Sequence, residues 1–263
     1  MNKLVYGLGA GLVYSCGAKG KWKEVLPKLL DSFPNAVLVS TVDMPYIVTE
    51  AIYGMVGQDR LFLDSGGFTL FRKQGELDTE AFEKLCEKMR RKFLKMCSIA
   101  KYHMIFELDN EYFRKEEDLL SPLNYCRQDV FDVTGMYPTP VFKMHQGFQY
   151  WLDLCESELY PTLAIGGLAQ DRAWHTNRDE LLKMMNYARQ CGKKVHLLGC
   201  QNVETYKFVR PDTVDYSIFQ YAINLAHAKK EHPELKTYED LKIHAVLYAF
   251  ARAKSRSFLY DTF

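Results

Sequence analysis

Two aspartates stand at or near the ends of short apolar runs, where they could do covalent chemistry. Asp64 directly follows the apolar residues 61–63, and Asp215 lies at the start of the run 214–219. Two carboxylates can break a glycosidic bond, because one attacks the anomeric carbon and the other handles the proton of the leaving group. Taken alone, each aspartate could equally serve only to cap the turn that follows its strand.

Other apolar runs are followed by residues that could hold a flat ring. A carboxylate and a glutamine can read the donor and acceptor edges of a purine, and paired glycines let a ring approach backbone N–H groups closely. Paired glycines also occur as plain turns, but several loops of this chain carry such residues together. The expected binding residues are Ser65, Gly66, Gly67, Phe68, Asp109, Gln146, Gly147, Gly166, Gly167 and Leu168.

The segments that must position these residues alternate between two kinds. Short runs rich in Val, Ile, Leu and Phe are typical of strands buried on both faces. We expect strands at residues 4–8, 36–40, 61–63, 103–106, 140–144, 162–165, 195–198 and 214–219. Longer amphipathic stretches predict helices at residues 79–97, 177–190, 202–209, 221–230 and 238–253, and residues 110–139 are expected to form an elaborated connection.

Alternating strands and helices predict a parallel α/β sheet. Eight strands favour a closed (β/α)8 TIM-like barrel that occupies residues 1–263 as a single domain. A doubly wound open sheet is the alternative. Barrels carry their chemistry on the loops that follow the strands, so the residues above are expected to meet at one rim.

The totals are those of an ordinary globular protein. Hydrophobic residues make up 48% of the 263 residues, charged residues make up 25%, and the formal net charge is +1. A polyanion would therefore have to be held by a local basic patch rather than by the overall charge. The seven cysteines show no metal-site spacing and no apolar run reaches membrane length, which indicates a reduced cytoplasmic protein without a membrane span or bound metal.

Taken in order, the motifs resemble those of the tRNA-guanine transglycosylase superfamily. Residues 64–68, Asp-Ser-Gly-Gly-Phe, match its Asp-Ser-Gly-Gly-Phe-Gln signature, with Thr69 in the place of the glutamine. Asp109 matches an aspartate that contacts the base. Gln146-Gly147 and Gly166-Gly167-Leu168 are similar to its Gln-Gly-Gly and Gly-Gly-Leu segments. Asp215 matches the nucleophile at the end of an Asp-x-Phe-Asp stretch.

The chain also departs from that superfamily. It lacks the Cys-x-Cys-x2-Cys zinc site of the tRNA enzymes, the Pro-Thr-Arg that follows their nucleophile, and part of their length. These differences resemble the short relatives, many of them from phages, that insert 7-deazaguanines into DNA. The resemblance therefore favours DNA over tRNA as the substrate, and the cytoplasm, or the host cytoplasm for a phage protein, as the location.

The resemblance implies exchange of guanine for a 7-deazaguanine such as preQ0 or preQ1. Asp215 would form a covalent bond to the sugar, and Asp64 would shuttle the proton between the two bases. No cofactor is implied, and family members often form homodimers. Two basic clusters could bind the nucleic acid, residues 88–95 and the group Arg252, Lys254 and Arg256, although either could be a solvated face.

Two other classes of function remain open from the sequence. A retaining glycosidase-type barrel would use the same pair of carboxylates, but it would usually carry tryptophans beside them. Here Trp22, Trp151 and Trp174 lie away from both aspartates in the sequence. A non-catalytic partner subunit that keeps the base pocket would not need both Asp64 and Asp215.

Overall fold

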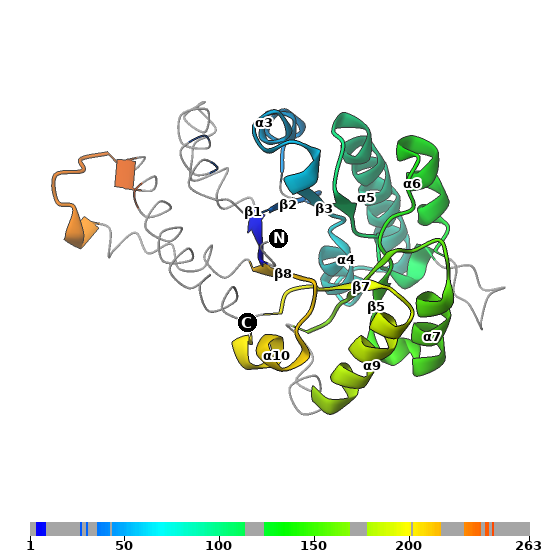
Figure 1. Cartoon of the computed structure of the whole chain (residues 1–263). Coiled ribbons are helices and arrows are strands. Elements are labelled where there is room, and N and C mark those ends of the chain that lie inside the picture. The colour runs from blue at the N-terminus through cyan, green and yellow to red at the C-terminus, as the bar shows by residue number, and fades with distance from the viewer. Residues whose placement is uncertain are drawn as a thin grey trace.

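A computed structural model of the chain describes residues 4–8, 27, 30, 36–42, 44–113, 124–168, 178–200, 202–216, 229–237, 240–241 and 244 (Figure 1). The helices expected at residues 221–230 and 238–253 lie largely outside these residues. Strands occur at all eight expected places, and residues 217–219 of the last expected strand lie outside the described residues.

The strands form one parallel sheet in the order β4-β3-β2-β1-β8-β7-β6-β5. Their bounds are β1 (Leu4–Leu8), β2 (Val37–Ser40), β3 (Leu61–Asp64), β4 (Met104–Ile105), β5 (Val141–Phe142), β6 (Thr162–Ile165), β7 (Lys194–Leu197) and β8 (Thr213–Tyr216). The two ends of this order meet, because Phe106 and Thr139 form a parallel bridge between the segments after β4 and before β5. The sheet therefore closes into a barrel, as the alternating pattern predicts.

Successive residues of each strand point to opposite faces, which divides the core into two parts. One set of buried side chains, such as Val39, Leu63 and Leu163, packs against the surrounding helices. The alternate set packs inside the barrel and comprises Leu38, Phe62, Met104, Phe106, Val141 and Ala164. Burial on both faces explains why the strands read as continuous apolar runs rather than as alternating ones.

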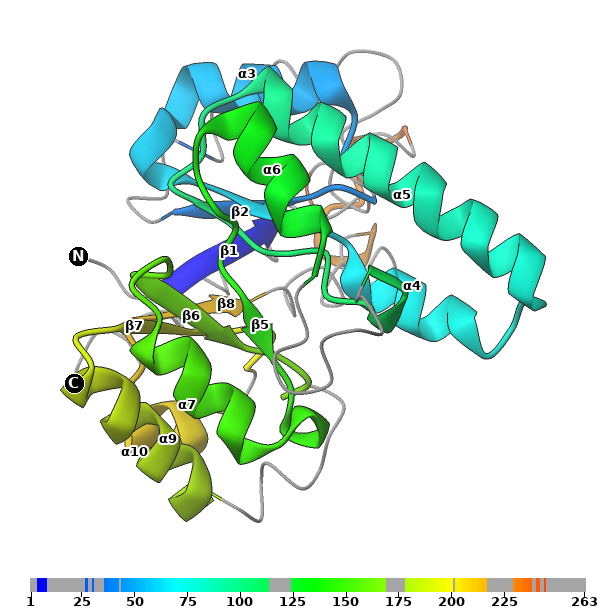
Figure 2. The same cartoon turned by 90° about the vertical axis from the view of Figure 1, so that its right-hand side faces the viewer.

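Helices cover the outside of the barrel. Figure 2 shows α3, α5 and α6 on one side of the strands and α7, α9 and α10 on the other. The helices are α3 (Tyr46–Val56), α4 (Gly67–Gln74), α5 (Thr79–Ile99), α6 (Cys126–Thr134), α7 (Phe148–Glu156), α9 (Arg178–Gln190) and α10 (Val203–Val209). Three short 3-10 helices, η1 (Gln58–Arg60), η2 (Glu111–Phe113) and η3 (Met144–Gln146), lie in the connections.

The helices agree with the expectations only in part. Helix α5 begins at Thr79 as expected, and it is capped by Asp78, whose side chain accepts a hydrogen bond from the backbone N–H of Ala81. The connection at residues 110–139 contains α6, which ends at Gly135 in the left-handed conformation. Helices α3, α4, α6 and α7 are not among the helices that the sequence predicts.

No helix in the described part of the chain is long and apolar enough to cross a membrane. The described cysteines all carry free thiols, and five of them are buried in the core: Cys86, Cys97, Cys126, Cys155 and Cys200.

Candidate active site

The alternation of the strands brings Asp64 and Asp215 to the interior of the barrel. Asp64 ends β3 two residues after Phe62, which packs inside, and Asp215 lies near the end of β8. All strands are parallel, so these positions lie toward the same carboxyl-terminal mouth. The two side chains are close enough for the charge of Asp215 to raise the pKa of Asp64.

Asp64 has an environment that disfavours its charge. Burial is the main cause that raises its pKa to about 6, and the charges of Asp215 and Asp109 act in the same direction. Hydrogen bonds from the N–H of Gly66, 3.2 Å from Oδ1, and from the hydroxyl of Ser40 act against this rise. A carboxyl group of this kind can hold a proton and release it close to neutral pH.

Asp215 is held in a different way. It is 6% exposed, and its Oδ1 accepts a hydrogen bond from the N–H of Gly199 at 2.5 Å. The ring atom Nε2 of His196 lies 3.3 Å from the same oxygen. A proton on Nε2 makes this contact a hydrogen bond to the carboxylate, which as an anion can only accept.

His196 is itself fixed by its surroundings. Its side chain is fully buried inside the barrel, its ring centroid lies 4.6 Å from that of Phe106, and its Nδ1 lies 2.8 Å from the hydroxyl oxygen of Thr213. In a neutral ring that donates through Nε2, Nδ1 accepts the hydroxyl proton of Thr213. The successive contacts from Thr213 to His196 and from His196 to Asp215 therefore orient the Asp215 carboxylate from inside the barrel.

Asp109 comes from the loop after β4 and lies over the backbone of Gly67. A Cβ atom added to Gly67 would stand 1.7 Å from Oδ1 of Asp109. The ammonium group of Lys143 lies 2.9 Å from Oδ2 and 2.7 Å from the backbone oxygen of Asp109. Burial raises the pKa of Asp109, whereas Lys143 lowers it.

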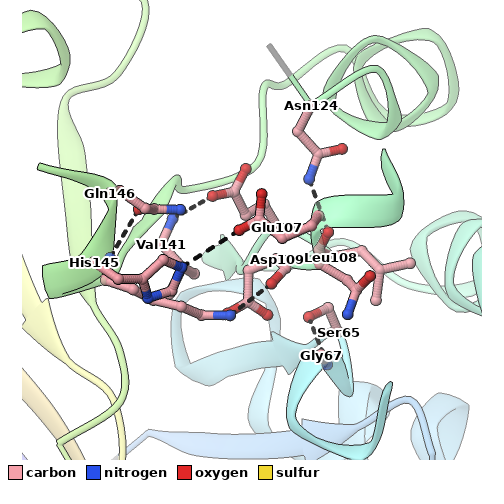
Figure 3. Close-up of polar contacts among 12 residues, drawn as sticks. Ser65, Gly67, Glu107, Leu108, Asp109, Asn124, Val141, His145 and Gln146 are labelled. Atoms are coloured by element: carbon pink, nitrogen blue, oxygen red, sulfur yellow. Dashed lines mark hydrogen bonds and ion pairs between the residues drawn. The ribbon is translucent and has the colours of Figure 1, made fainter. Parts of the chain in front are cut away.

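The loop that carries Asp109 is clamped along its length (Figure 3). Glu107 accepts a hydrogen bond from the N–H of Val141 at 2.6 Å and forms a buried ion pair with Arg127, also at 2.6 Å. The backbone oxygen of Leu108 accepts a hydrogen bond from the amide of Asn124 at 2.7 Å. Because these bonds join the loop to β5 and α6, the position of Asp109 is set by buried contacts rather than by the loop alone.

The glycines of the motif serve close packing. Gly66 has φ 85° and would bring a Cβ within 2.4 Å of a methyl group of Val42, and Gly67 leaves room for Asp109. Gly166 would bring a Cβ within 2.8 Å of Val141, and Gly167 has φ 79°. In each pair, one glycine adopts the left-handed conformation and the other permits a close approach.

Three other expected binding residues are held by contacts within the protein. Gln146 uses its side-chain oxygen to accept the N–H of Lys143 at 2.8 Å, while its Nε2 is buried without a partner among the described residues. Ser65 is buried beneath the turn and accepts the N–H of Gly67 at 3.4 Å. Leu168 packs into the core, so only its backbone could meet a ligand.

Two expected residues lie at the surface. Phe68, in the first turn of α4, is 51% exposed. Gly147 is exposed and turns the chain from η3 into α7 with φ 84°. Both follow residues of the mouth directly and could border a bound ligand.

Only one of the two basic clusters expected to bind nucleic acid lies among the described residues. Arg252, Lys254 and Arg256 lie outside the described residues. In the cluster at residues 88–95, Arg90 pairs with Asp129 at 2.7 Å and Lys92 donates to the backbone oxygen of Val42 at 2.6 Å. Part of that cluster therefore holds α5 to its neighbours.

Four residues of this region were missed in the sequence, namely Ser40, Lys143, His196 and Gly199. The first three are polar residues at or beside the ends of buried strands. Ser40 and Lys143 each lie two residues after an inward-facing residue, and His196 pairs with Thr213 of the neighbouring strand. A search for polar residues at such positions could have found them. Gly199 acts through its backbone N–H and leaves no such signal.

Among the described residues, His, Cys, Asp and Glu side chains form no group of three that could hold a metal ion. The candidate site brings together carboxylates, the ammonium group of Lys143 and the imidazole of His196.

Comparison with known proteins supports the fold. No family model and no curated protein matches the chain. Among solved structures, the chain is similar to a candidate fructose-1,6-biphosphate aldolase from Coccidioides immitis, with a TM-score of 0.55 and 12% identity. The match covers 98% of this chain and 89% of that one. At this identity the likeness shows the fold, and the chain is an α/β protein of the TIM-barrel type.

Proposed function

We propose that the protein exchanges guanine in a nucleic acid for a 7-deazaguanine, with Asp215 as nucleophile and Asp64 as acid and base. The observation that carries the proposal is the contrast between the two carboxyl groups. Asp64 has its pKa raised to about 6, while Asp215 accepts hydrogen bonds from Gly199 and His196. Paired carboxyl groups in such different environments are typical of an acid/base group and its nucleophilic partner.

In the first half of the reaction, a carboxylate oxygen of Asp215 attacks C1′ of the target nucleoside. The C1′–N9 bond breaks, and its electron pair leaves with guanine. Asp64 in its protonated form gives its proton to the departing base. The sugar is then bound to Asp215 as an ester.

In the second half, the incoming base reverses these steps. Ionised Asp64 takes the proton from N9 of the 7-deazaguanine, and N9 attacks C1′. The bond between C1′ and Asp215 breaks, which restores the carboxylate. One glycosidic bond replaces another, so the exchange needs no external source of energy.

The base would be held by the residues around Asp109. The Asp109 carboxylate can accept N–H groups of the purine, the unpartnered Nε2 of Gln146 can donate, and the Gly167 backbone can approach the ring. The target nucleotide must leave its stack to reach a site inside a barrel mouth, which costs a few kcal/mol.

DNA is the substrate favoured by the resemblance of the chain to short transglycosylases without a zinc site. The rival substrate is tRNA. Because the base exchange would follow the same steps on either nucleic acid, one assay can compare the two. The experiment measures incorporation of radiolabelled guanine into double-stranded DNA and into tRNA by the full chain. Asp215→Asn and Asp64→Asn are the test variants. Asp132→Asn, which removes an exposed carboxylate of α6, is the control.

Label that enters one nucleic acid, and is lost in Asp215→Asn but kept in Asp132→Asn, would support the exchange and identify the substrate. Label in neither nucleic acid would contradict the proposal. In that case, release of sugar from glycoside substrates would test the retaining glycosidase, and isolation of complexes would test the partner subunit.

A further inference from the structure

Lys143 stands beside the base-binding carboxylate in a position that has no assigned role in the proposed exchange. It follows β5 two residues after Val141, whose side chain packs inside the barrel. Its side chain is 20% exposed and that of Asp109 is 13% exposed. A charged lysine this far buried needs polar partners, and Asp109 supplies them.

The ammonium group has more donors than its contacts use. It carries three N–H groups, and its contacts among the described residues are the backbone oxygen of Asp109 at 2.7 Å and Oδ2 of Asp109 at 2.9 Å. Within the part of the chain that the structure describes, one proton is thus left to donate to a ligand. Donor and acceptor stand side by side, with Nζ and Oδ2 in direct contact.

This donor–acceptor pair has a definite complement among the bases. A 6-oxopurine presents the acceptor O6 next to the donor N1–H, so Lys143 can donate to O6 while Asp109 accepts from N1–H. Adenine presents the opposite order, an amino donor next to an acceptor nitrogen. Adenine would place donor against donor and acceptor against acceptor, which leaves buried polar groups unpaired.

We propose that Lys143 is a specificity-determining residue that selects 6-oxopurines by donating to O6. The inference rests on the proposed function, since it names the edge of the base that the same site reads. It adds a direct lysine contact to the base and a reason for the rejection of adenine.

The test compares bases that differ at the atoms concerned. Equilibrium dialysis would measure binding of guanine, hypoxanthine, 2-aminopurine and adenine to the wild-type chain and to Lys143→Met. Guanine and hypoxanthine have O6, whereas 2-aminopurine lacks it. Lys183→Met, at an exposed position of α9, is the matched control.

We expect Lys143→Met to weaken guanine and hypoxanthine binding by about 10- to 100-fold, as for loss of a charge-assisted hydrogen bond. Binding of 2-aminopurine should change by less than about 2-fold, because this base has no acceptor at position 6 to take the proton of Lys143. Lys143→Arg should restore part of the difference. Circular dichroism would establish that each variant is folded, and Lys143→Gln offers a second substitution should the methionine variant not fold.

An equal loss for all bases would mean that Lys143 only holds the Asp109 loop, and it would overturn the inference. Unchanged guanine binding in Lys143→Met would do the same, while leaving the base-exchange proposal intact. Failure of the wild-type chain to bind any of the purines would instead contradict the proposed function itself, and the inference with it.

Discussion

Oδ1 of Asp109 occupies the space that a side chain on Gly67 would need, 1.7 Å from the ideal Cβ position. Asp109 lies in the loop after β4 and Gly67 is the first residue of α4, and the approach is possible only because residue 67 is a glycine. The second glycine of the Asp-Ser-Gly-Gly-Phe motif is thereby explained by a carboxylate that lies 42 positions further along the printed sequence.

Replacement of Gly67 by alanine should displace Asp109 and weaken base binding. We expect the affinity for guanine to fall by about 10-fold or more, because a charge-assisted hydrogen bond is lost. The matched control is Gly75→Ala, since Gly75 ends the same helix, has φ −89° and has no atom within 4 Å of an added Cβ. Equal guanine binding by both variants, measured by equilibrium dialysis, would contradict this role for Gly67.

Replacement of His196 by phenylalanine should impair turnover more than stability. A phenyl ring can pack beside Phe106, but it cannot donate to Asp215. We expect kcat to fall by about 10- to 100-fold with a small change in KM, because the lost bond orients the nucleophile and not the base. Thr213→Val should have a smaller effect, since it removes only the partner of Nδ1. Steady-state kinetics of guanine exchange, with thermal unfolding as a check on folding, would measure both. A His196→Phe variant with unchanged kcat would show that the contact does not matter.

Asp64 should lower the stability of the protein at neutral pH. Its pKa is raised from 3.8 to about 6 in the folded state, so the folded protein binds this proton more tightly than the unfolded chain does. The resulting stabilisation is fully present below pH 3.8 and is lost as the pH rises through about 6. Asp64→Asn should therefore increase the free energy of unfolding at neutral pH by about 1 to 2 kcal/mol, a value reduced for partial solvent exposure.

This gain should shrink as the buffer is made more acidic, because wild-type Asp64 then becomes neutral as well. Urea unfolding across the acidic-to-neutral range would measure it, with Asp132→Asn as the control for loss of an exposed carboxylate. A gain that does not depend on pH would indicate a cause other than the charge of Asp64.

Arg127 should be important for stability because it neutralises Glu107 at the seam where β4 meets β5. The guanidinium group also donates to the hydroxyl groups of Tyr150 at 2.6 Å and Tyr160 at 3.3 Å. Arg127→Ala would leave Glu107 buried without its charge partner, and we expect a loss of about 3 to 5 kcal/mol in the free energy of unfolding. The double variant Arg127→Ala, Glu107→Gln should lose less, since the unpaired charge is gone. Denaturant unfolding of both variants tests this, and a double variant that is less stable than the single one would contradict it.

The sequence by itself determined the fold class and the strands. Strands buried on two faces are mostly apolar, so each of the eight runs is visible without knowledge of its neighbours. The clustering of Asp64, Asp109 and Asp215 toward one mouth also follows from the chain, because parallel strands direct their carboxyl ends to the same rim. Short helices such as α4 and α6 were not predicted, because their few apolar residues do not show a clear helical spacing.

Only the tertiary structure decided what each residue at the mouth does. The inward direction of His196 depends on its register with Thr213 in the next strand, and the contact of Lys143 with Asp109 joins two loops. The same long-range packing places Leu168 in the core. These outcomes depend on contacts between segments distant in the sequence, and such contacts set burial, pKa and hydrogen-bond partners in ways that local residue patterns do not encode.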